Sequence, residues 1–256
     1  MARVIALIPA RANSKGIQEK NWRSLAGGMC CVELAARCAS QALAGSGASL
    51  VLSKDAGGYV PMVVDVHIKR PAELAQDDTP MIDVVRHALS QVPGDPDDIW
   101  LLLQPTQPLR TPAHIRAALD LLEASGADSV VSVVELPLSH SPDLACGILD
   151  GKLYAHYNGG EGWSMGSLGE QPTRRQDAST TYRRDGTVYA FYRRTVRGNI
   201  YGRHTAPLII PADESCELDT MADWATLEAR LRRRTSDDCE PCAHCHQLSV
   251  GPRPNP

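Results

Sequence analysis

Residues 3–25 read RVIALIPARANSKGIQEKNWRSL, and the interpretation of the whole chain starts from this stretch. Its first part, Arg3–Ile8, is an apolar and partly β-branched run, which predicts a buried strand. Pro9 ends the strand, because proline has no N–H to donate to a neighbouring strand. The small-residue loop 10–16 follows directly. We therefore expect a tight loop at the carboxyl end of the first strand of a parallel sheet, the edge where such sheets hold their ligands.

Cations gather in and after this loop. Arg11, Lys15, Lys20 and Arg23 are accompanied by a single acid, Glu19. Ammonium, guanidinium and backbone N–H groups at the end of a strand favour a polyanion, and a nucleotide polyphosphate is the usual polyanion at that place. The stretch matches neither G-x-x-x-x-G-K-[ST] nor G-x-G-x-x-G, so neither common phosphate motif applies. A solvated basic loop is the alternative interpretation.

The composition limits the choice of class. A chain of 256 residues with 43% hydrophobic residues can bury the core of one α/β domain. Its net charge of −4 argues against nucleic acid as a partner. Arg11 interrupts the first apolar run, so we expect neither a secretory signal nor a membrane span, and a cytoplasmic location. The eight cysteines are then expected to be reduced thiols.

Strands and helices are predicted to alternate along the chain, which is typical of a mostly parallel sheet. The apolar run Asp98–Leu103 is the best candidate for the centre of this sheet. Glycines and a proline in 54–61 make a helix there improbable. Other strands are expected at Ser49–Ser53, Met62–Ile68, Ser129–Leu136 and Leu208–Ile210, and helices at Met29–Ala44, Met81–Val92 and Pro112–Ser125.

The motif IPARANSKGIQEKN, residues 8–21, resembles the opening of the cytidylyltransferases that activate acidic sugars, the CMP-sialic acid and CMP-KDO synthetases. The resemblance implies a three-layer Rossmann-like nucleotide-diphospho-sugar transferase fold of the α/β class. It also implies CTP as a substrate. In that family the residues matching Arg11, Lys15 and Lys20 hold the phosphates, and the residue matching Asn21 contacts the nucleotide.

Two further stretches match the same family. KRPAELAQDDTP, residues 69–80, resembles the segment that lies against cytosine, with Arg70 on the base side. A turn that caps the following helix explains the same residues. Met81 stands where the family often has a small hydroxyl residue, so the selection of cytosine is less secure than nucleotide binding. QPTQPLRT, residues 104–111, resembles the family's acceptor loop and assigns Gln104 to the sugar; two prolines that merely stiffen a turn are the alternative.

The stretch RRQDASTTYRRDGTVYAFY, residues 174–192, resembles a third motif, in which an arginine before glutamine binds the acidic sugar. Arg175 occupies that position. A guanidinium suits a carboxylate because two parallel hydrogen bonds fix its orientation. An ordinary surface arginine is the competing interpretation. Asp185 replaces the family's asparagine and is expected to add negative charge near the site.

SCELDTMADW, residues 215–224, resembles the family's magnesium-binding segment. Residues two apart on an extended chain point the same way, so Glu217 and Asp219 could share one Mg²⁺. Asp219 is the safer ligand because glutamate is longer than the usual aspartate. Capping of the last helix is the alternative role for Asp219.

We expect residues 1–234 to form the cytidylyltransferase domain. Within it, 137–182 is a β-rich excursion, which in the family packs against a second subunit; a homodimer is therefore implied, although a lid fits the sequence equally well. Residues 235–256 form a tail expected to be flexible. Soft metal ligands occur in it at short spacing, but reduced cysteines without a metal are favoured there: Cys239, Cys242, Cys245 and His246.

The resemblance implies transfer of CMP from CTP to an acidic 2-keto sugar, with release of pyrophosphate and without membrane or nucleic-acid partners. Arg11, Lys20 and Asp219 are the expected catalytic residues, and no general base is evident. Two alternatives stay open. One is a different small acid as the acceptor, such as KDO, another nonulosonic acid or a phosphonate. The other is a nucleotide-binding homologue that no longer turns over.

Overall fold

The computed structural model describes residues 2–25, 27–158, 163–166, 174, 177 and 179–237. A seven-stranded sheet with the order β10-β5-β9-β4-β1-β2-β3 forms its centre. The strands are β1 (Val4–Ala10), β2 (Ser49–Lys54), β3 (Val66–Lys69), β4 (Ile99–Leu102), β5 (Ser129–Glu135), β9 (Tyr182–Tyr192) and β10 (Thr205–Ile209). β4 is the fourth of the seven strands, which confirms the prediction that the DIWLLL run lies at the centre of the sheet.

The sheet is mostly parallel, as predicted. β1 pairs in parallel with β2 and β4, β2 with β3, and β5 with β10. β9 runs antiparallel between β4 and β5. The carboxyl ends of β1, β2 and β4 therefore meet at one edge, and the loops that follow them share that edge.

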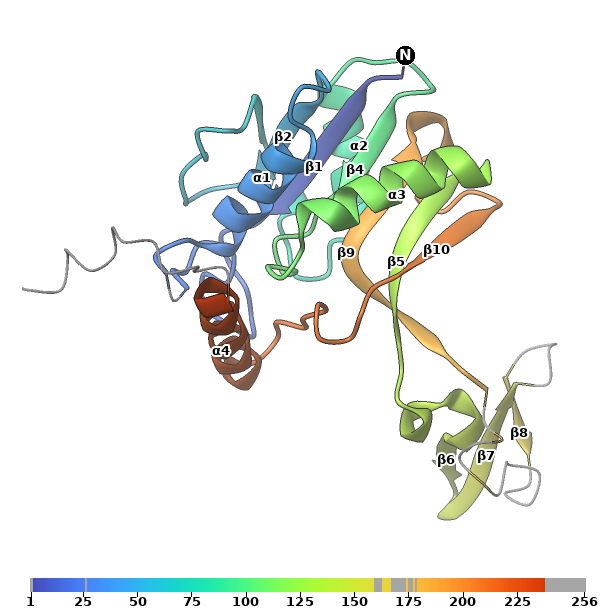
Figure 1. The fold of residues 1–256 in the computed structure, drawn as a ribbon. Coiled ribbons are helices and arrows are strands. Elements are labelled where there is room, and N and C mark those ends of the chain that lie inside the picture. The colour runs from blue at the N-terminus through green and yellow to red at the C-terminus, as the bar shows by residue number, and fades with distance from the viewer. Residues whose placement is uncertain are drawn as a thin grey trace, which may run out of the picture.

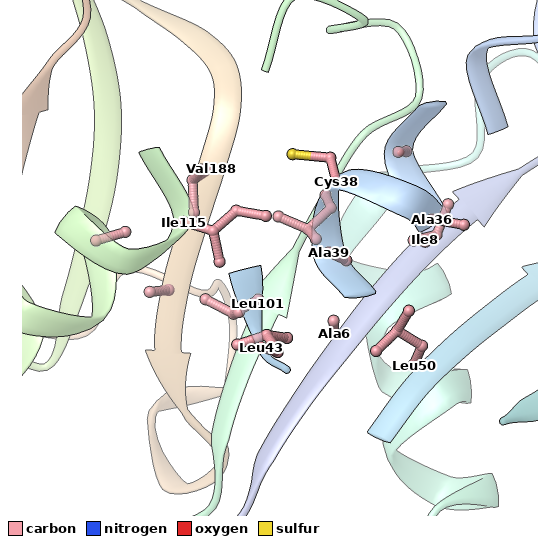
Figure 2. Packing of buried hydrophobic residues seen from close by; sticks show 14 of the residues in the cluster. Ala6, Ile8, Ala36, Cys38, Ala39, Leu43, Leu50, Leu101, Ile115 and Val188 are labelled. Carbon is pink, nitrogen blue, oxygen red and sulfur yellow. The ribbon is translucent and has the colours of Figure 1, made fainter. Parts of the chain in front are cut away.

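Helices cover both faces of the sheet, which gives the three layers (Figure 1). α1 (Cys31–Ala42) and α3 (Pro112–Ser125) lie on one face, and α2 (Met81–Gln91) lies on the other. On the first face Ala36 and Ala39 of α1, together with Leu43 just past its end, belong to one apolar cluster with Ile8 of β1, Leu50 of β2 and Leu101 of β4 (Figure 2). Small residues on α1 allow the helix to approach the sheet closely.

α3 illustrates how local sequence sets an element's bounds. Pro112 occupies its first turn, the Thr111 hydroxyl accepts a hydrogen bond from the His114 backbone N–H, and Gly126 ends it with φ of 64°. Proline is tolerated at a helix start and glycine is favoured just past the end. The predicted range Pro112–Ser125 is confirmed.

α4 (Met221–Asp237) packs at the loop edge, where Trp224 and Leu227 form a third apolar cluster with Ile17, Leu25 and other residues. Thr220 and Asp223 cap its start, because the Thr220 backbone N–H donates to the Asp223 carboxylate at 2.7 Å and the Asp223 N–H donates back to the Thr220 hydroxyl at 3.2 Å. This arrangement is a capping box.

One predicted strand differs in detail. The third strand begins at Val66 rather than Met62, because the chain turns after Pro61, where the Val64 N–H donates to the Pro61 carbonyl at 3.0 Å. As expected, the segment 55–65 forms no helix. Among the described residues, no helix combines the length and apolar character that crossing a lipid bilayer requires.

The predicted β-rich excursion is a small antiparallel sheet that stands away from the main body beyond the ends of β5 and β9 (Figure 1). Its strands are β6 (Cys146–Leu149), β7 (Lys152–Asn158) and β8 (Trp163–Gly166). Asp150 and Gly151 join β6 to β7 with φ of 51° and 73°. Two positive φ angles in a two-residue turn are typical of the type I′ hairpin, for which Asp-Gly is a preferred sequence. Of the predicted tail 235–256, residues 235–237 continue α4, and residues 238–256, with the cysteines, lie outside the described residues.

Candidate functional site

Two cations of the loop after β1 contact the same carboxylate, that of Asp77. Arg11 Nη1 lies 2.6 Å from Asp77 Oδ1, and Lys15 Nζ lies 3.2 Å from Asp77 Oδ2. Desolvation opposes ionisation of Asp77, but hydrogen bonds from Lys15 and Arg11 outweigh it and hold the pKa of this carboxyl below its usual value. Two cations that converge on one carboxylate can also converge on a phosphate group.

Lys20 joins the first loop to the segment before α4. Its Nζ donates to the Leu218 carbonyl at 2.5 Å and to Asp219 Oδ1 at 3.1 Å. Gly16 makes this approach possible, since a Cβ at position 16 would lie 2.2 Å from the Asp219 carbonyl oxygen. Lys20 and Gly16 therefore allow the first loop to contact a segment that lies about 200 residues later in the sequence.

Asn21 and Arg70 hold neighbouring backbone in place. Asn21 Nδ2 donates to the Arg11 carbonyl at 3.0 Å. Arg70 is buried and donates to the Ser53 hydroxyl at 3.2 Å and the Ser53 carbonyl at 2.7 Å. Burial lowers the pKa of the Arg70 guanidinium to about 10, so the group stays charged at neutral pH. It contributes fixed positive charge to the end of β2.

These residues line one cavity of about 290 Å³ at the carboxyl edge of the sheet. It includes six of the residues predicted from the sequence, drawn from the first loop, the end of β3, the end of β4 and the start of α4. They lie around a single open space, and three of them are cations. The lining consists of Pro9, Arg11, Ser14, Lys20, Asn21, Arg70, Met81, Gln104, Pro105, Thr106 and Asp219.

A second cavity of about 270 Å³ adjoins the first, because Met81 and Gln104 line both. Apart from Gln104 and Asn199, the side chains of the second cavity are mainly apolar or aromatic. It is lined by Pro80, Met81, Ile82, Val85, Leu102, Gln104, Tyr189, Gly198, Asn199, Ile200 and Tyr201. Gln104 therefore stands between a cationic cleft and an apolar pocket.

Buried polar groups fix the loop that carries Gln104. Arg110 Nη2 donates to the Gln104 carbonyl at 2.6 Å, and Arg110 Nε donates to the Thr187 carbonyl of β9 at 2.5 Å. Burial lowers the pKa of Arg110 to about 10. Gln107 ties the same loop to the segment before α4, since its Oε1 accepts from the Cys216 N–H at 3.2 Å. The loop is thus braced from two sides.

The negative charge of Asp185 lies beside the site, where it acts on the Arg110 guanidinium and on Tyr189 of the second cavity. Its carboxylate accepts hydrogen bonds from the Thr187 N–H at 3.0 Å and the Thr187 hydroxyl at 2.5 Å, and it is buried. The following residue, Gly186, has φ of 78°, and a Cβ there would lie 2.6 Å from Gln104 Oε1. Asp185 therefore shapes a turn in β9 that packs against Gln104.

Three predicted site residues do not line the cationic cleft. Lys15 is 82% exposed at its side chain and reaches only Asp77. Glu217 Oε1 pairs with Arg183 Nη1 at 2.6 Å, whereas Asp219 pairs with Lys20, so the two carboxylates point to different cations. Arg175 lies outside the described residues.

Some residues of the site escaped the sequence interpretation. Asp77 lies inside the RPAELAQDD motif. An acid in a motif that was expected near the basic loop could have predicted its ion pairs with Arg11 and Lys15. Tyr189 lies inside the motif 174–192, whereas Ile200 and Tyr201 had no such signal, because their approach depends on the path of the loop 196–204. Within the described ranges, no three His, Cys, Asp or Glu side chains gather closely enough to hold a metal on their own.

Comparison with known proteins agrees with this geometry. The profile of a family described as cytidylyltransferase matches residues 5–148. The chain is 31% identical over 251 residues to a CMP-N,N'-diacetyllegionaminic acid synthase of Legionella pneumophila, covering 88% of this chain and 95% of that protein. It is 25% identical to an N-acylneuraminate cytidylyltransferase of Streptococcus agalactiae and 26% identical to one of Oncorhynchus mykiss.

The coverage of these relatives differs. The matches span 86% and 90% of this chain but only 51% and 50% of the Streptococcus and Oncorhynchus proteins, so the chain spans about half their length. Among solved structures, a CMP:2-keto-3-deoxy-manno-octonic acid synthetase complexed with CTP is similar with a TM-score of 0.59 and 14% identity, covering 91% of this chain and 100% of that one. This last similarity concerns the fold.

Proposed function

The chain belongs to the cytidylyltransferase family, and we propose that it transfers CMP from CTP to a sialic-acid-like 2-keto acid sugar and releases pyrophosphate. The observation that carries the proposal is the 290 Å³ cavity, in which Arg11, Lys20, Arg70, Gln104 and Asp219 meet. A cleft with three cations at the carboxyl edge of a parallel sheet suits a triphosphate. The adjoining pocket provides a place for a second substrate.

Arg11, Lys15 and Lys20 hold the phosphates in this proposal. Asp77 now occupies the contact that Arg11 and Lys15 offer, and a phosphate group would take over that position. Lys20 and Arg11 stabilise the charge that develops on the leaving pyrophosphate, because fixed donors next to a developing charge lower the barrier. Asn21 and Arg70, which line the same cavity, are the residues proposed to contact the nucleoside.

Mg²⁺ is the proposed cofactor, and Asp219 is its protein ligand. The donor set fits, because Mg²⁺ commonly binds one or two carboxylates together with substrate phosphates and water rather than a complete protein cage. Asp219 has a side chain that is 79% exposed and lines the cleft. Glu217 would have to leave Arg183 to join it. When bound, the ion supplies neutralisation of phosphate charge.

The acceptor lies toward the second cavity. Gln104 offers an amide at its entrance, and Arg175 remains the proposed partner of the sugar carboxylate. The apolar lining, which includes Ile82, Val85 and Ile200, favours an acid sugar with acyl or methyl substituents over one that carries only hydroxyl groups. This argues for a sialic-acid-like acceptor rather than KDO.

The reaction is an in-line displacement. The anomeric hydroxyl oxygen of the sugar forms a bond to the α-phosphorus while the bond from that phosphorus to the bridging oxygen breaks, and pyrophosphate leaves with the electron pair. The hydroxyl proton passes to solvent or to a base that we do not assign. Such transfers depend mainly on positioning and on neutralised charge.

We also propose a homodimer in the cytoplasm, where CTP is available. The small sheet β6-β7-β8 exposes Ile148, Leu149 and Leu153, with Ile148 78% exposed. Apolar side chains of this size on a protruding hairpin fit an interface between two copies. Met81 at the junction of both cavities offers no hydrogen bond to a base, so the preference for CTP over other triphosphates is to be measured together with activity.

Pyrophosphate release with CTP, Mg²⁺ and a panel of acid sugars tests this function. We expect turnover with N-acylated nonulosonic acids and little with KDO. Lys20→Ala should lower kcat at least about a hundredfold, since losing one preorganised donor typically costs this much. Arg37→Ala, which removes one positive charge from an exposed position on α1, should have no effect. Full activity of Lys20→Ala would disprove the proposed mechanism.

A further inference from the structure

A third cavity, of about 370 Å³, adjoins the acceptor-side pocket through Gly198 and Asn199 and shares no lining residue with the reaction cleft. It is built where β9 ends and β5 begins, and the loop 196–204 closes it. Three arginines are among its lining residues, which are Asp128, Arg194, Thr195, Arg197, Gly198, Asn199, Gly202 and Arg203. Neither the proposed reaction nor the motif matches give these arginines a role.

Two of the arginines have uncommitted charge. Among the described residues, Arg197 and Arg203 form no ion pair. The Arg197 backbone carbonyl accepts a hydrogen bond from Arg86, so the main chain is anchored while the guanidinium stays available. Arg194, by contrast, pairs with Asp97 and lies 4.0 Å from the centre of the Tyr192 ring. The cavity therefore contains an excess of positive charge.

The carboxylate within the cavity is engaged by backbone. Asp128 Oδ2 accepts from the Arg203 N–H at 2.8 Å and from the His204 N–H at 3.0 Å. These two hydrogen bonds hold the pKa of Asp128 below its usual value. Asp128 therefore stays ionised and offsets one positive charge, so that of the charges on Asp128, Arg197 and Arg203 one positive charge remains for an external anion.

The cavity is preformed. Asn199 Oδ1 accepts from the Tyr201 N–H at 2.8 Å and from the Gly202 N–H at 3.3 Å, which makes a local turn. Gly202 has φ of 72°, and a Cβ there would lie 2.4 Å from Asp128 Cβ. Ile200 between them is buried in the core against α2. A ligand would therefore bind without ordering this loop, which favours affinity.

The same loop forms one wall of the acceptor-side pocket. Gly198 and Asn199 line both cavities, and Ile200 and Tyr201 project into the acceptor side. Ser129 Oγ donates to the Tyr201 carbonyl at 2.6 Å, and Thr205 Oγ1 donates to the same carbonyl at 2.9 Å. A ligand held by Arg197 and Arg203 would contact one side of the loop 196–204. The other side of this loop lines the acceptor-side pocket, where the sugar is proposed to bind.

We propose that this arginine pocket binds a small phosphate-bearing metabolite and that its occupancy changes the affinity of the acceptor-side pocket. Guanidinium groups bind phosphate oxygens through paired hydrogen bonds, and a volume of about 370 Å³ admits more than one phosphoryl group or a phosphorylated small molecule. The binding site itself stands apart from the proposed reaction, whereas the effect on the acceptor rests on that proposed function.

Calorimetric titration with inorganic pyrophosphate, without added metal, tests the binding site. Wild-type protein should bind at two sites, the reaction cleft and the arginine pocket. Arg197→Gln/Arg203→Gln should lose the second site, with affinity reduced more than about tenfold, while keeping the first. Arg11→Gln/Lys15→Gln should show the reverse. Arg37→Gln, an exposed arginine on α1, is the matched control and should keep both sites.

A single site in wild-type protein, or two sites in Arg197→Gln/Arg203→Gln, would overturn the proposal. Because these two side chains are exposed, the double variant should fold, which circular dichroism verifies. Titration needs no turnover, so its failure is distinguishable from failure of the proposed reaction.

Kinetics test the coupling. At saturating CTP the cleft is filled, so inorganic phosphate can reach the arginine pocket or the acceptor-side pocket, and the arginine variant tells these two apart. We expect phosphate to shift the KM for the acid sugar in wild-type enzyme and to leave KM unchanged in Arg197→Gln/Arg203→Gln. An equal response of both enzymes would show that phosphate acts elsewhere and would overturn the coupling.

Discussion

At the scale of single residues, the site depends on the orientation of a few side chains. Substitution of Gly186 tests this dependence for the Gln104 amide. The φ of 78° at Gly186 and the 2.6 Å between a hypothetical Cβ and Gln104 Oε1 mean that Gly186→Ala must displace the Gln104 amide. We expect the KM for the acid sugar to rise about three- to tenfold, the value of one hydrogen bond, and the KM for CTP to stay constant.

Gly126→Ala is the matched control for this substitution. Gly126 has φ of 64° at the end of α3, and a Cβ there would meet nothing within 4 Å. Both variants carry the same kind of backbone strain, of order 1 kcal/mol. Only Gly186→Ala should alter acceptor kinetics. An identical loss in both would assign the effect to stability and not to Gln104.

The charged residues of the cleft could be predicted, because the sequence gives their identities. The hydrogen-bond partner of each side chain could not be predicted. Arg11, Lys20 and Asp219 were expected to share a cleft, and they line the same cavity. Asp185 was expected to bring negative charge near the site and lies there, but its hydrogen bonds with Thr187 were not predicted. A side chain's partner depends on the rotamer and on the turn that carries it, and a sequence without structure specifies neither.

At the scale of elements, the contact between the first loop and the segment before α4 assembles the cleft. Gly16→Ala places a Cβ 2.2 Å from the Asp219 carbonyl oxygen, which is backbone and cannot rotate away. The loop must move, and Lys20 then loses its contacts with Leu218 and Asp219. We expect pyrophosphate release to fall at least about tenfold, as when a catalytic group is displaced by a fraction of an ångström.

Thermal melting separates this effect from unfolding. Gly47→Ala, at φ of 71° in the remote loop after α1 and with nothing within 4 Å of its Cβ, should lose about 1 kcal/mol of stability and keep its activity. If Gly16→Ala retained normal turnover with an unchanged melting temperature, the first loop and α4 would not need to meet for catalysis.

Element bounds followed from the sequence wherever local chemistry alone sets them. The Thr111-Pro112 start and the Gly126 end define α3, and an apolar run defines β4. β3 began later than predicted because the turn after Pro61 depends on a hydrogen bond within 61–64. The antiparallel insertion of β9 between β4 and β5 is a matter of pairing across the sheet, which hydrophobic patterning does not encode.

At the scale of the whole molecule, buried thiols set an upper limit on the pH range of stability. Burial raises the pKa of Cys31 to about 12 and that of Cys216 to about 11. In the unfolded chain a thiol ionises near pH 9, so the folded state holds more protons above that pH. The contribution of these groups is complete below about pH 9 and is lost as the pH rises toward the folded values.

We therefore expect the free energy of unfolding in urea to fall between about pH 9 and pH 11, by up to roughly 1.4 kcal/mol per pH unit for each thiol. Cys31→Ala should be less stable at neutral pH but should show a shallower alkaline decline. Equal slopes for the variant and the wild-type protein would mean that other groups, such as Tyr59, govern the alkaline limit.

The protruding sheet gives the prediction of largest scale, the homodimer. Ile148 and Leu153 face each other across the β6–β7 hairpin, and they are 78% and 53% exposed. Charges introduced into an apolar interface would be buried without partners, which costs about 2 kcal/mol or more at a central position. Ile148→Glu/Leu153→Glu should therefore shift the protein from dimer to monomer in analytical ultracentrifugation.

Met62→Glu supplies the control, since Met62 is fully exposed in the loop before β3 and lies on the main body. This variant should sediment as the wild-type protein does. If the hairpin only covers its own active site as a lid, the double variant would keep its sedimentation coefficient and lose activity. If the hairpin joins two copies, sedimentation and activity should change together, because each subunit would then complete the acceptor site of its partner.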